Sequence, residues 1–189
     1  MKISQLLTYR ISHPWIAMGI YLPLLIVLSY LNYHFNPLPF TTLLPLILFG
    51  ILSWSFVEYI LHRFVFHLTK IKEPWRNLAS GPHMAHHREV DIPNLILASP
   101  LSSLSFGLPI YFIYSLICWS FSKGAWMEMG MMISYMVYEW MHYAAHCYQP
   151  KWTYFKNLKH YHLKHHFKYP NDCFGVTQTF WDKVFGTYK

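Results

Sequence analysis

Four long apolar stretches limit what this chain of 189 residues can fold into. They cover about 15–33, 41–62, 101–121 and 125–146. Each is close to the roughly 20 residues that a helix needs to cross the hydrocarbon of a bilayer. Backbone N–H and C=O groups inside a bilayer must be paired within the segment, which a helix achieves. We therefore expect an all-α integral membrane protein with four transmembrane helices.

The composition supports a membrane protein and excludes several other classes. Apolar residues make up 54% of the chain and charged residues only 12%, about half the usual share in soluble domains. So few charges cannot cover a water-exposed surface, and so apolar a chain is not typical of a disordered protein. The net charge of +7 could indicate nucleic-acid binding. Because the basic residues flank apolar spans, we expect them to face a membrane, and we expect no nucleic-acid partner.

The basic residues also predict the orientation in the membrane. Two lie in the N-terminal arm, five between Arg63 and Arg88, and seven after Pro150, whereas the loop between the third and fourth spans has only Lys123. The positive-inside rule places the basic side, with both termini, in the cytosol. The expected membrane is a bacterial inner membrane or the endoplasmic reticulum. Three scattered cysteines form no metal or disulfide pattern and are expected to be free thiols.

Histidines are repeated at matching positions in the two halves of the chain. The first half contains HX4H followed by HX2HH, and the second half contains HX3H followed by HX2HH. The ten residues are His62, His67, His83, His86, His87, His142, His146, His162, His165 and His166. An offset of 79 relates four of the five pairs, and an offset of 80 relates the first. We therefore expect two helical hairpin repeats, with a cytosolic helical cap formed by 63–100 and 147–189.

The histidine spacing predicts a metal site with two ions. Residues at i, i+3 and i+4 share one face of a helix, so each HX2HH triplet should project together. His62 and His67 would lie about 140° apart on an ideal helix, so we expect a distortion there. Ten nitrogen ligands divide into five for each of two ions. His13, His34 and His160 fall outside the pattern, and His160 lies about 200° around the helix from His162.

The ligands alone do not identify the metal. Imidazole binds iron, zinc, copper and nickel alike. An open site with two ions against a membrane favours attack on a lipid chain, and an unactivated C–H bond calls for redox-active iron and O2. Zinc binds such sites more tightly than Fe(II), so we expect zinc to compete for the site in purified protein. Glu58 in VEYILH and Glu139 in YEWMH are candidate acceptors for the N–H groups of ligating rings.

The ordered set HX4H, HX2HH, HX3H, HX2HH resembles the membrane fatty acid hydroxylase superfamily. The tail YHLKHHFKYPNDCFGVTQTFWDKVFGT, from Tyr161 to Thr187, is similar in particular to fatty acid 2-hydroxylases. The resemblance covers nearly the whole chain and implies one hydroxylase domain over 1–189. It implies a di-iron monooxygenase that uses O2 to hydroxylate C2 of a fatty acyl chain, free or in a ceramide-type lipid. The eukaryotic relatives commonly carry a fused cytochrome b5 domain, so here we expect a separate electron donor such as cytochrome b5 or ferredoxin.

Other functions remain open at this stage. Within the same superfamily, the alternatives are a sterol desaturase or hydroxylase and a carotenoid hydroxylase, although the tail favours a 2-hydroxylase. A membrane metal transporter or storage protein is a non-enzymatic alternative, but transporters place ligands near the middle of the bilayer. A haem protein with two histidine ligands would leave the two HX2HH triplets without a role.

Overall fold

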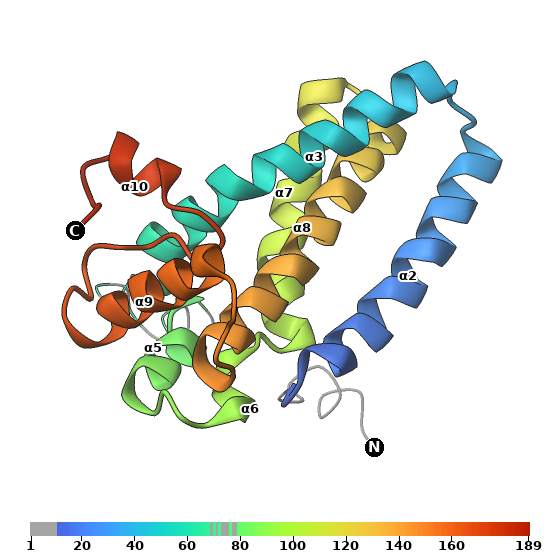
Figure 1. Cartoon of the computed structure of the whole chain (residues 1–189). Coiled ribbons are helices and arrows are strands. Elements are labelled where there is room, and N and C mark those ends of the chain that lie inside the picture. Colours follow the sequence, from blue (N-terminus) through green and yellow to red (C-terminus); the bar gives the residue numbers. More distant parts are fainter. Residues whose placement is uncertain (1–10, 69, 71, 73–75, 77–78) are drawn as a thin grey trace.

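All regular structure in the described part of the chain is helical. The computed structural model describes residues 11–68, 70, 72, 76 and 79–189. Helix α2 (Pro14–Phe35) runs away from the histidine-bearing end, and α3 (Phe40–Ile60) returns to it. Helix α7 (Pro100–Cys118) again runs away from the histidine-bearing end, and α8 (Phe121–Cys147) returns to it (Figure 1). The N-terminal arm, with the basic residues Lys2 and Arg10, lies outside the described residues.

Three helical segments of the described chain are long and apolar enough to cross a membrane. They are Pro14–Phe35, Phe40–Phe66 and Pro93–Cys118. The predicted fourth span is not among them, although α8 has 27 residues and is therefore about 40 Å long at 1.5 Å per residue. Helix α8 packs against α2, α3 and α7. Because these neighbours cover it, α8 can carry polar side chains that a lipid-facing helix could not.

The helices α7 and α8 meet a few residues before the predicted boundary between the third and fourth spans. We expected the third span to end near residue 121 and the fourth to begin near 125. The structure ends α7 at Cys118 and begins α8 at Phe121. Ser120 accounts for the early start, because its side chain accepts a hydrogen bond from the Lys123 N–H and so caps α8.

Helices α3 and α8 approach each other closely at two glycines. A Cβ atom on Gly50 would lie 1.9 Å from the Met127 carbonyl oxygen, and one on Gly130 would lie 2.1 Å from the Ile47 carbonyl oxygen. Small residues allow such close contact between membrane helices. The side chain of Trp54 on α3 then packs edge-on against Tyr135 of α8, with ring centroids 5.4 Å apart. This crossing fixes α8, which carries His142, against α3, which leads directly to His62.

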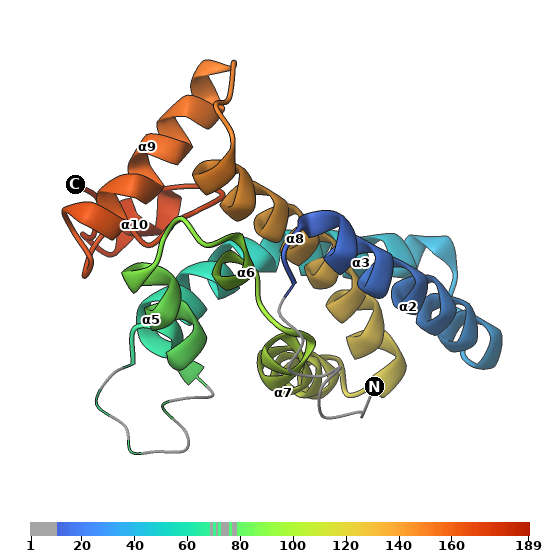
Figure 2. The ribbon, with the colours of Figure 1, turned by 90° about the horizontal axis from the view of Figure 1, so that it is seen from below.

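Short helices gather at the end of the bundle where α3 and α8 finish (Figures 1 and 2). They are η1 (Leu61–Phe66), a π-helix that continues α3, and α5 (Gly81–Arg88), α6 (Pro93–Ile96), α9 (Thr153–Phe167) and α10 (Phe180–Val184). The tail is held by Asp182, which is fully buried. Its carboxylate accepts hydrogen bonds from the N–H groups of Phe174 and Gly175, both at 2.8 Å. The tail loop is thereby fixed against the histidine-bearing helices.

Candidate metal centre

The ten histidines of the repeated pattern meet at one end of the bundle in two groups of five. The first group is His62, His67, His83, His87 and His165. The second group is His86, His142, His146, His162 and His166. Within each group, one ring nitrogen from every residue lies within 4.8 Å of the others. Four separate helical segments and the residue after η1 supply these side chains.

The π-helix η1 brings His62 and His67 into the same group. The sequence predicted a distortion at this point, and η1 confirms it. A π-helix has i to i+5 hydrogen bonds and so turns more slowly than an α-helix. Residues five apart then come closer in angle, and the rings of His62 and His67 lie 5.2 Å apart between centroids.

The middle histidine of each triplet belongs to the group formed mainly by the other half of the chain. His86 joins the second group and His165 joins the first. A shared helix face predicted that the members of each triplet project together, but it did not predict that they divide between two groups. Helical phase gives the reason: His87 lies about 40° from His83, whereas His86 lies about 60° away on the other side. The offsets of 79 and 80 still convert one group into the other, with His86 and His165 exchanged.

The ring nitrogens of the first group are arranged as ligands of a cation. His62 donates its Nδ1–H to the Phe174 carbonyl oxygen at 2.5 Å, and His165 donates its Nδ1–H to the Asp172 carbonyl oxygen at 2.7 Å. In a neutral ring this leaves Nε2 with a lone pair and no proton. Nε2 of His165 nevertheless lies 3.1 Å from Nε2 of both His67 and His87. Five ring nitrogens that converge in this way could hold a positive ion between them.

The second group has the same spacing. Nε2 of His146 lies 2.9 Å from Nε2 of His162, which is 3.0 Å from Nε2 of His166. Nε2 of His86 lies 3.2 Å from Nε2 of His142. Bonds of about 2.1 Å from a metal to two nitrogens at right angles give a nitrogen separation of about 3.0 Å. Both groups therefore fit one metal ion each.

Burial keeps these imidazoles neutral, which is the form that binds metal. Burial, and after it the neighbouring His165, lowers the pKa of His67 to about 4. The pKa of His86 falls to about 3 from burial first and then from His146. The pKa of His165 is also lowered to about 4 by burial, although the Asp172 carbonyl acts in the opposite direction. At neutral pH the groups therefore bring no charge of their own.

The two candidate carboxylates contact backbone groups in the described residues. Glu58 accepts hydrogen bonds from the N–H groups of Val176 and Thr177, at 2.6 and 2.9 Å, and from the Thr177 hydroxyl. Oε1 of Glu139 lies 3.4 Å from the Ala98 N–H. The predicted hydrogen bond from a clustered imidazole to either carboxylate is absent from the contacts of these residues. For two rings of the first group, tail carbonyls take that role.

The three histidines outside the pattern lie away from both groups. His160 is exposed on α9, and His34 is exposed near the end of α2. His13 caps α2 by accepting a hydrogen bond from the Trp15 N–H at 3.3 Å. The cysteines are free thiols, as predicted. Sequence reasoning missed Asp182, whose only signal was its place in the WDKVFGT segment.

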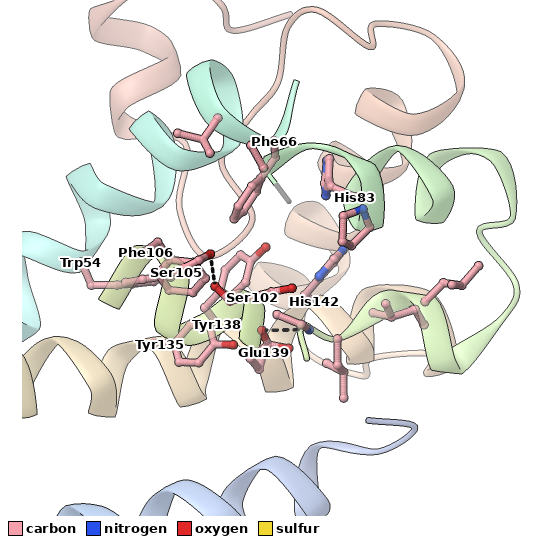
Figure 3. Close-up of a pocket in the computed structure, with 17 residues that line it drawn as sticks. Trp54, Phe66, His83, Ser102, Ser105, Phe106, Tyr135, Tyr138, Glu139 and His142 are labelled. Carbon is pink, nitrogen blue, oxygen red and sulfur yellow. Dashed lines mark hydrogen bonds between the residues drawn. The ribbon is translucent and has the colours of Figure 1, made fainter. Parts of the chain in front are cut away.

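A cavity of about 320 Å³ adjoins both histidine groups (Figure 3). His83 of the first group and His142 of the second both line it. Most of its remaining wall is apolar and aromatic, including Trp54, Phe66 and Phe106. Glu139 lies beside His142, whereas Trp54 and Phe106 lie farther from the histidines. The cavity can therefore hold an apolar chain with one end close to the two groups.

Comparison with known proteins gives consistent matches. The family model described as fatty acid hydroxylase matches residues 47–187. Dihydroceramide fatty acyl 2-hydroxylase FAH2 of Arabidopsis thaliana is 36% identical over 143 residues, which are 75% of this chain and 60% of that protein. Fatty acid 2-hydroxylase of Mus musculus is 30% identical over 156 residues, which are 79% of this chain and 41% of that protein. The chain thus spans about 60% or less of the length of these curated relatives.

The fold also matches a solved structure. That structure is described as full-length scs7p with only the hydroxylase domain visible. The TM-score is 0.80 and the sequence identity is 26%. The match covers 100% of this chain and 70% of the other.

Proposed function

Because this chain belongs to the fatty acid hydroxylase family, we propose that it is a monooxygenase that hydroxylates C2 of a fatty acyl chain, free or in a ceramide-type lipid. The observation that carries this proposal is the pair of five-histidine groups beside one apolar cavity. The reaction consumes one acyl C–H bond, O2, two electrons and two protons, and it yields one C–OH group and water. The electrons come from a separate redox protein.

The ten clustered histidines would hold two iron ions, with five nitrogens for each ion. Bound iron supplies the O2 chemistry that an unactivated C–H bond requires. An ion that accepts six ligands keeps one position free beside five imidazoles. The chain itself orients the rings, through the Phe174 and Asp172 carbonyls that hold His62 and His165.

The cavity would hold the acyl chain and keep water from it. Aromatic side chains such as Phe66, Phe106 and Tyr138 provide an apolar wall, which favours a hydrocarbon chain over water. His83 and His142 come from different groups and line the same cavity. A substrate carbon placed between them lies close to both groups, so the carbon at that end of the chain is the one that reacts.

We also propose the arrangement in the membrane. Residues 1–189 would form one domain with four transmembrane helices, of which α8 is the inner one, built as two hairpin repeats. The two histidine groups, which the repeat offsets interconvert, support the repeats. Basic residues of the described chain gather at the histidine end, and Lys123 lies at the other end. That distribution supports a cytosolic cap and cytosolic termini, in a bacterial inner membrane or the endoplasmic reticulum.

Reconstitution with defined metals tests this function. Protein stripped of metal is supplied with Fe(II) or zinc, a reduced donor, an acyl lipid and O2 labelled with oxygen-18. We expect a 2-hydroxyacyl product that carries the label with iron and none with zinc, because zinc has no redox chemistry. Mass spectrometry locates the hydroxyl group. Oxidation at another carbon, or desaturation, would favour another branch of the superfamily, and bound metal without any product would favour a metal-binding protein.

The outer face of α9 is the proposed docking surface for the electron donor. Its inner face carries His162, His165 and His166, so a donor on the outer face is about one helix diameter, roughly 10–12 Å, from the two groups. The basic residues on and near α9 are Lys151, Lys156, Lys159, Lys164 and Lys168. This charge favours an acidic donor such as cytochrome b5 or ferredoxin.

We expect turnover with a separate acidic donor to slow as salt rises. The Debye length falls from about 10 Å at 0.1 M to about 3 Å at 1 M, so steering between opposite charges weakens. Lys156→Glu should raise the KM for the donor, because Lys156 is exposed. Lys123→Glu is the matched control at the far end of the bundle. If neither higher ionic strength nor Lys156→Glu changes turnover with the donor, then the donor does not dock on α9.

A further inference from the structure

Two hollows, one apolar and one basic, adjoin at the corner where α8 ends and α9 begins (Figure 2). We propose that together they bind one anionic phospholipid of the cytosolic leaflet, with an acyl chain in the apolar hollow and the phosphate in the basic hollow. The inference rests on the proposed arrangement in the membrane and does not depend on the proposed reaction.

The apolar hollow has a volume of about 530 Å³, which is within the usual range for a ligand site. Its lining from α8 consists of Val137, Trp140, Met141, Ala144 and Ala145. Residues with this spacing lie on one face of a helix. From the first to the last of them the face is about 12 Å long, at 1.5 Å per residue. A segment of acyl chain therefore has room to lie along α8.

This hollow is separate from the cavity at the metal centre. Among the described residues, none lines both the hollow and that cavity. Ala144 lies about 200° around α8 from His142. A chain in the hollow is therefore on the opposite side of α8 from the histidine that lines the cavity, so it is not the chain that reacts.

The basic hollow has a volume of about 510 Å³ and is lined by Lys151, Lys156 and Lys159. Its described lining includes no Asp or Glu. Within the part of the chain that the structure describes, none of the three lysines has a carboxylate partner. Lys159 donates to the Tyr148 carbonyl oxygen at 2.8 Å, and its ammonium group keeps two further N–H donors. The hollow thus offers charged donors to a phosphate group.

The two hollows adjoin because Pro150, Lys151 and Lys159 line both of them. A site that changes from apolar to basic in this way matches a molecule with an apolar chain and an anionic head. A free phosphate ion would use the lysines and leave the apolar hollow without a ligand. An uncharged lipid would use the apolar hollow and leave the lysines without an anion. The charge and the apolar surface together therefore favour an anionic phospholipid.

Exposed aromatic side chains place this corner at the surface of the bilayer. Trp152, just before α9, is 73% exposed, and Trp15, at the start of α2, is 63% exposed. The ring of Trp15 lies 5.2 Å from that of Trp140, which lines the apolar hollow. Trp is enriched where membrane meets water. In the proposed orientation this is the cytosolic side, whose anionic lipids attract basic residues.

Native mass spectrometry of the whole protein in detergent tests the proposal. The protein receives phosphatidylglycerol or phosphatidylcholine with the same acyl chains, and no electron donor is present. Each lysine near an anionic lipid surface contributes about 5-fold to affinity. We therefore expect one phosphatidylglycerol per chain, retained about 10-fold more strongly than phosphatidylcholine. Lys151→Gln/Lys159→Gln should lower the affinity for phosphatidylglycerol by about 10- to 30-fold.

Lys164→Gln/Lys168→Gln is the matched control. It removes the same charge from the same region, but neither residue lines either hollow. This variant should retain phosphatidylglycerol as the wild type does. Metal content and melting temperature without added lipid show that each variant is folded. An equal loss in both double variants would indicate general charge attraction and would overturn the proposal, as would equal retention of the two lipids by the wild type.

A further variant tests the apolar hollow without changing a charge. Ala144→Leu places a larger side chain in the hollow and leaves every lysine in place, so retention of phosphatidylglycerol should fall. Soluble glycerol 3-phosphate should not displace the lipid, because it has no acyl chain. Displacement by glycerol 3-phosphate, together with unchanged retention in Ala144→Leu, would show a site for free anions and overturn the proposal.

The donor surface on α9 is the competing explanation for these lysines. Lys156 stays unchanged in the lipid experiment, because its substitution tests the donor surface. If Lys151→Gln/Lys159→Gln raises the KM for an acidic donor but retains phosphatidylglycerol as the wild type does, then the two lysines bind a protein and the lipid proposal is wrong. A loss of lipid measured without any donor supports the lipid site, whether or not hydroxylation is observed.

Discussion

Replacing His165 with alanine is expected to abolish the proposed 2-hydroxylation and to lower the bound metal from the proposed two ions to about one per chain. His165 is the member of the first group that comes from α9, and its Nε2 lies 3.1 Å from those of both His67 and His87. Loss of a residue that merely supports a ligand costs about 10–100-fold in metal affinity or activity. Loss of a ligand should cost at least as much. Elemental analysis and product assays on the same preparation measure both effects.

His160→Ala is the matched control for this variant, because His160 lies on the same helix and is exposed. A surface change of this kind usually alters the free energy of unfolding by no more than about 0.5 kcal/mol. His160→Ala should therefore keep both ions and near-normal activity. Loss of metal in His160→Ala, with metal retained in His165→Ala, would contradict the assignment of α9 residues to the two groups.

Alanine at Gly130 is expected to destabilise the fold severely, by about 3 kcal/mol or more. A Cβ atom there would lie 2.1 Å from a backbone oxygen of α3, and backbone cannot move aside as a flexible side chain can. Helices α3 and α8 must then separate, which places this change at or above the usual range for overpacking. The melting temperature in detergent should fall by about 6 °C or more for a chain of this size.

Gly19→Ala provides the comparison. Gly19 lies on α2, and a Cβ atom at that position meets nothing within 4 Å. Alanine also has a higher helix propensity than glycine by about 1 kcal/mol, so the melting temperature should not fall. If Gly130→Ala and Gly19→Ala melt at the same temperature as the wild type, then α3 and α8 do not approach as closely as described.

The histidine pattern could be interpreted from the sequence because it depends on local spacing. Helical phase predicted that His160 lies apart from His162, and it predicted a distortion between His62 and His67. The exchange of His86 and His165 between the two groups was not predicted, because the three histidines of a triplet were treated as one helix face. A 60° offset within a triplet is small on one helix, but it becomes important when a second group lies beside the first.

Contacts between distant parts of the chain could not be predicted in this way. His62 is held by the carbonyl of Phe174, which is 112 residues away. A backbone carbonyl has no signature in the sequence, so the sequence indicates only the carboxylates Glu58 and Glu139 as acceptors. Helix α8 shows a similar limit, because hydropathy reports how well a helix suits lipid. It does not report whether neighbouring helices cover it.

The exchanged histidines also determine when metal can be bound during synthesis. Before His165 leaves the ribosome, the first group has four of its five nitrogens, and before His166 follows, the second group also has four. The two groups are therefore completed by two consecutive residues of α9. In a nascent chain, the first group is complete and the second incomplete only during the single elongation step between His165 and His166. Neither of the proposed ions would have all five nitrogens until α9 has been made, and a chain cut short before α9 would lack two complete groups rather than one.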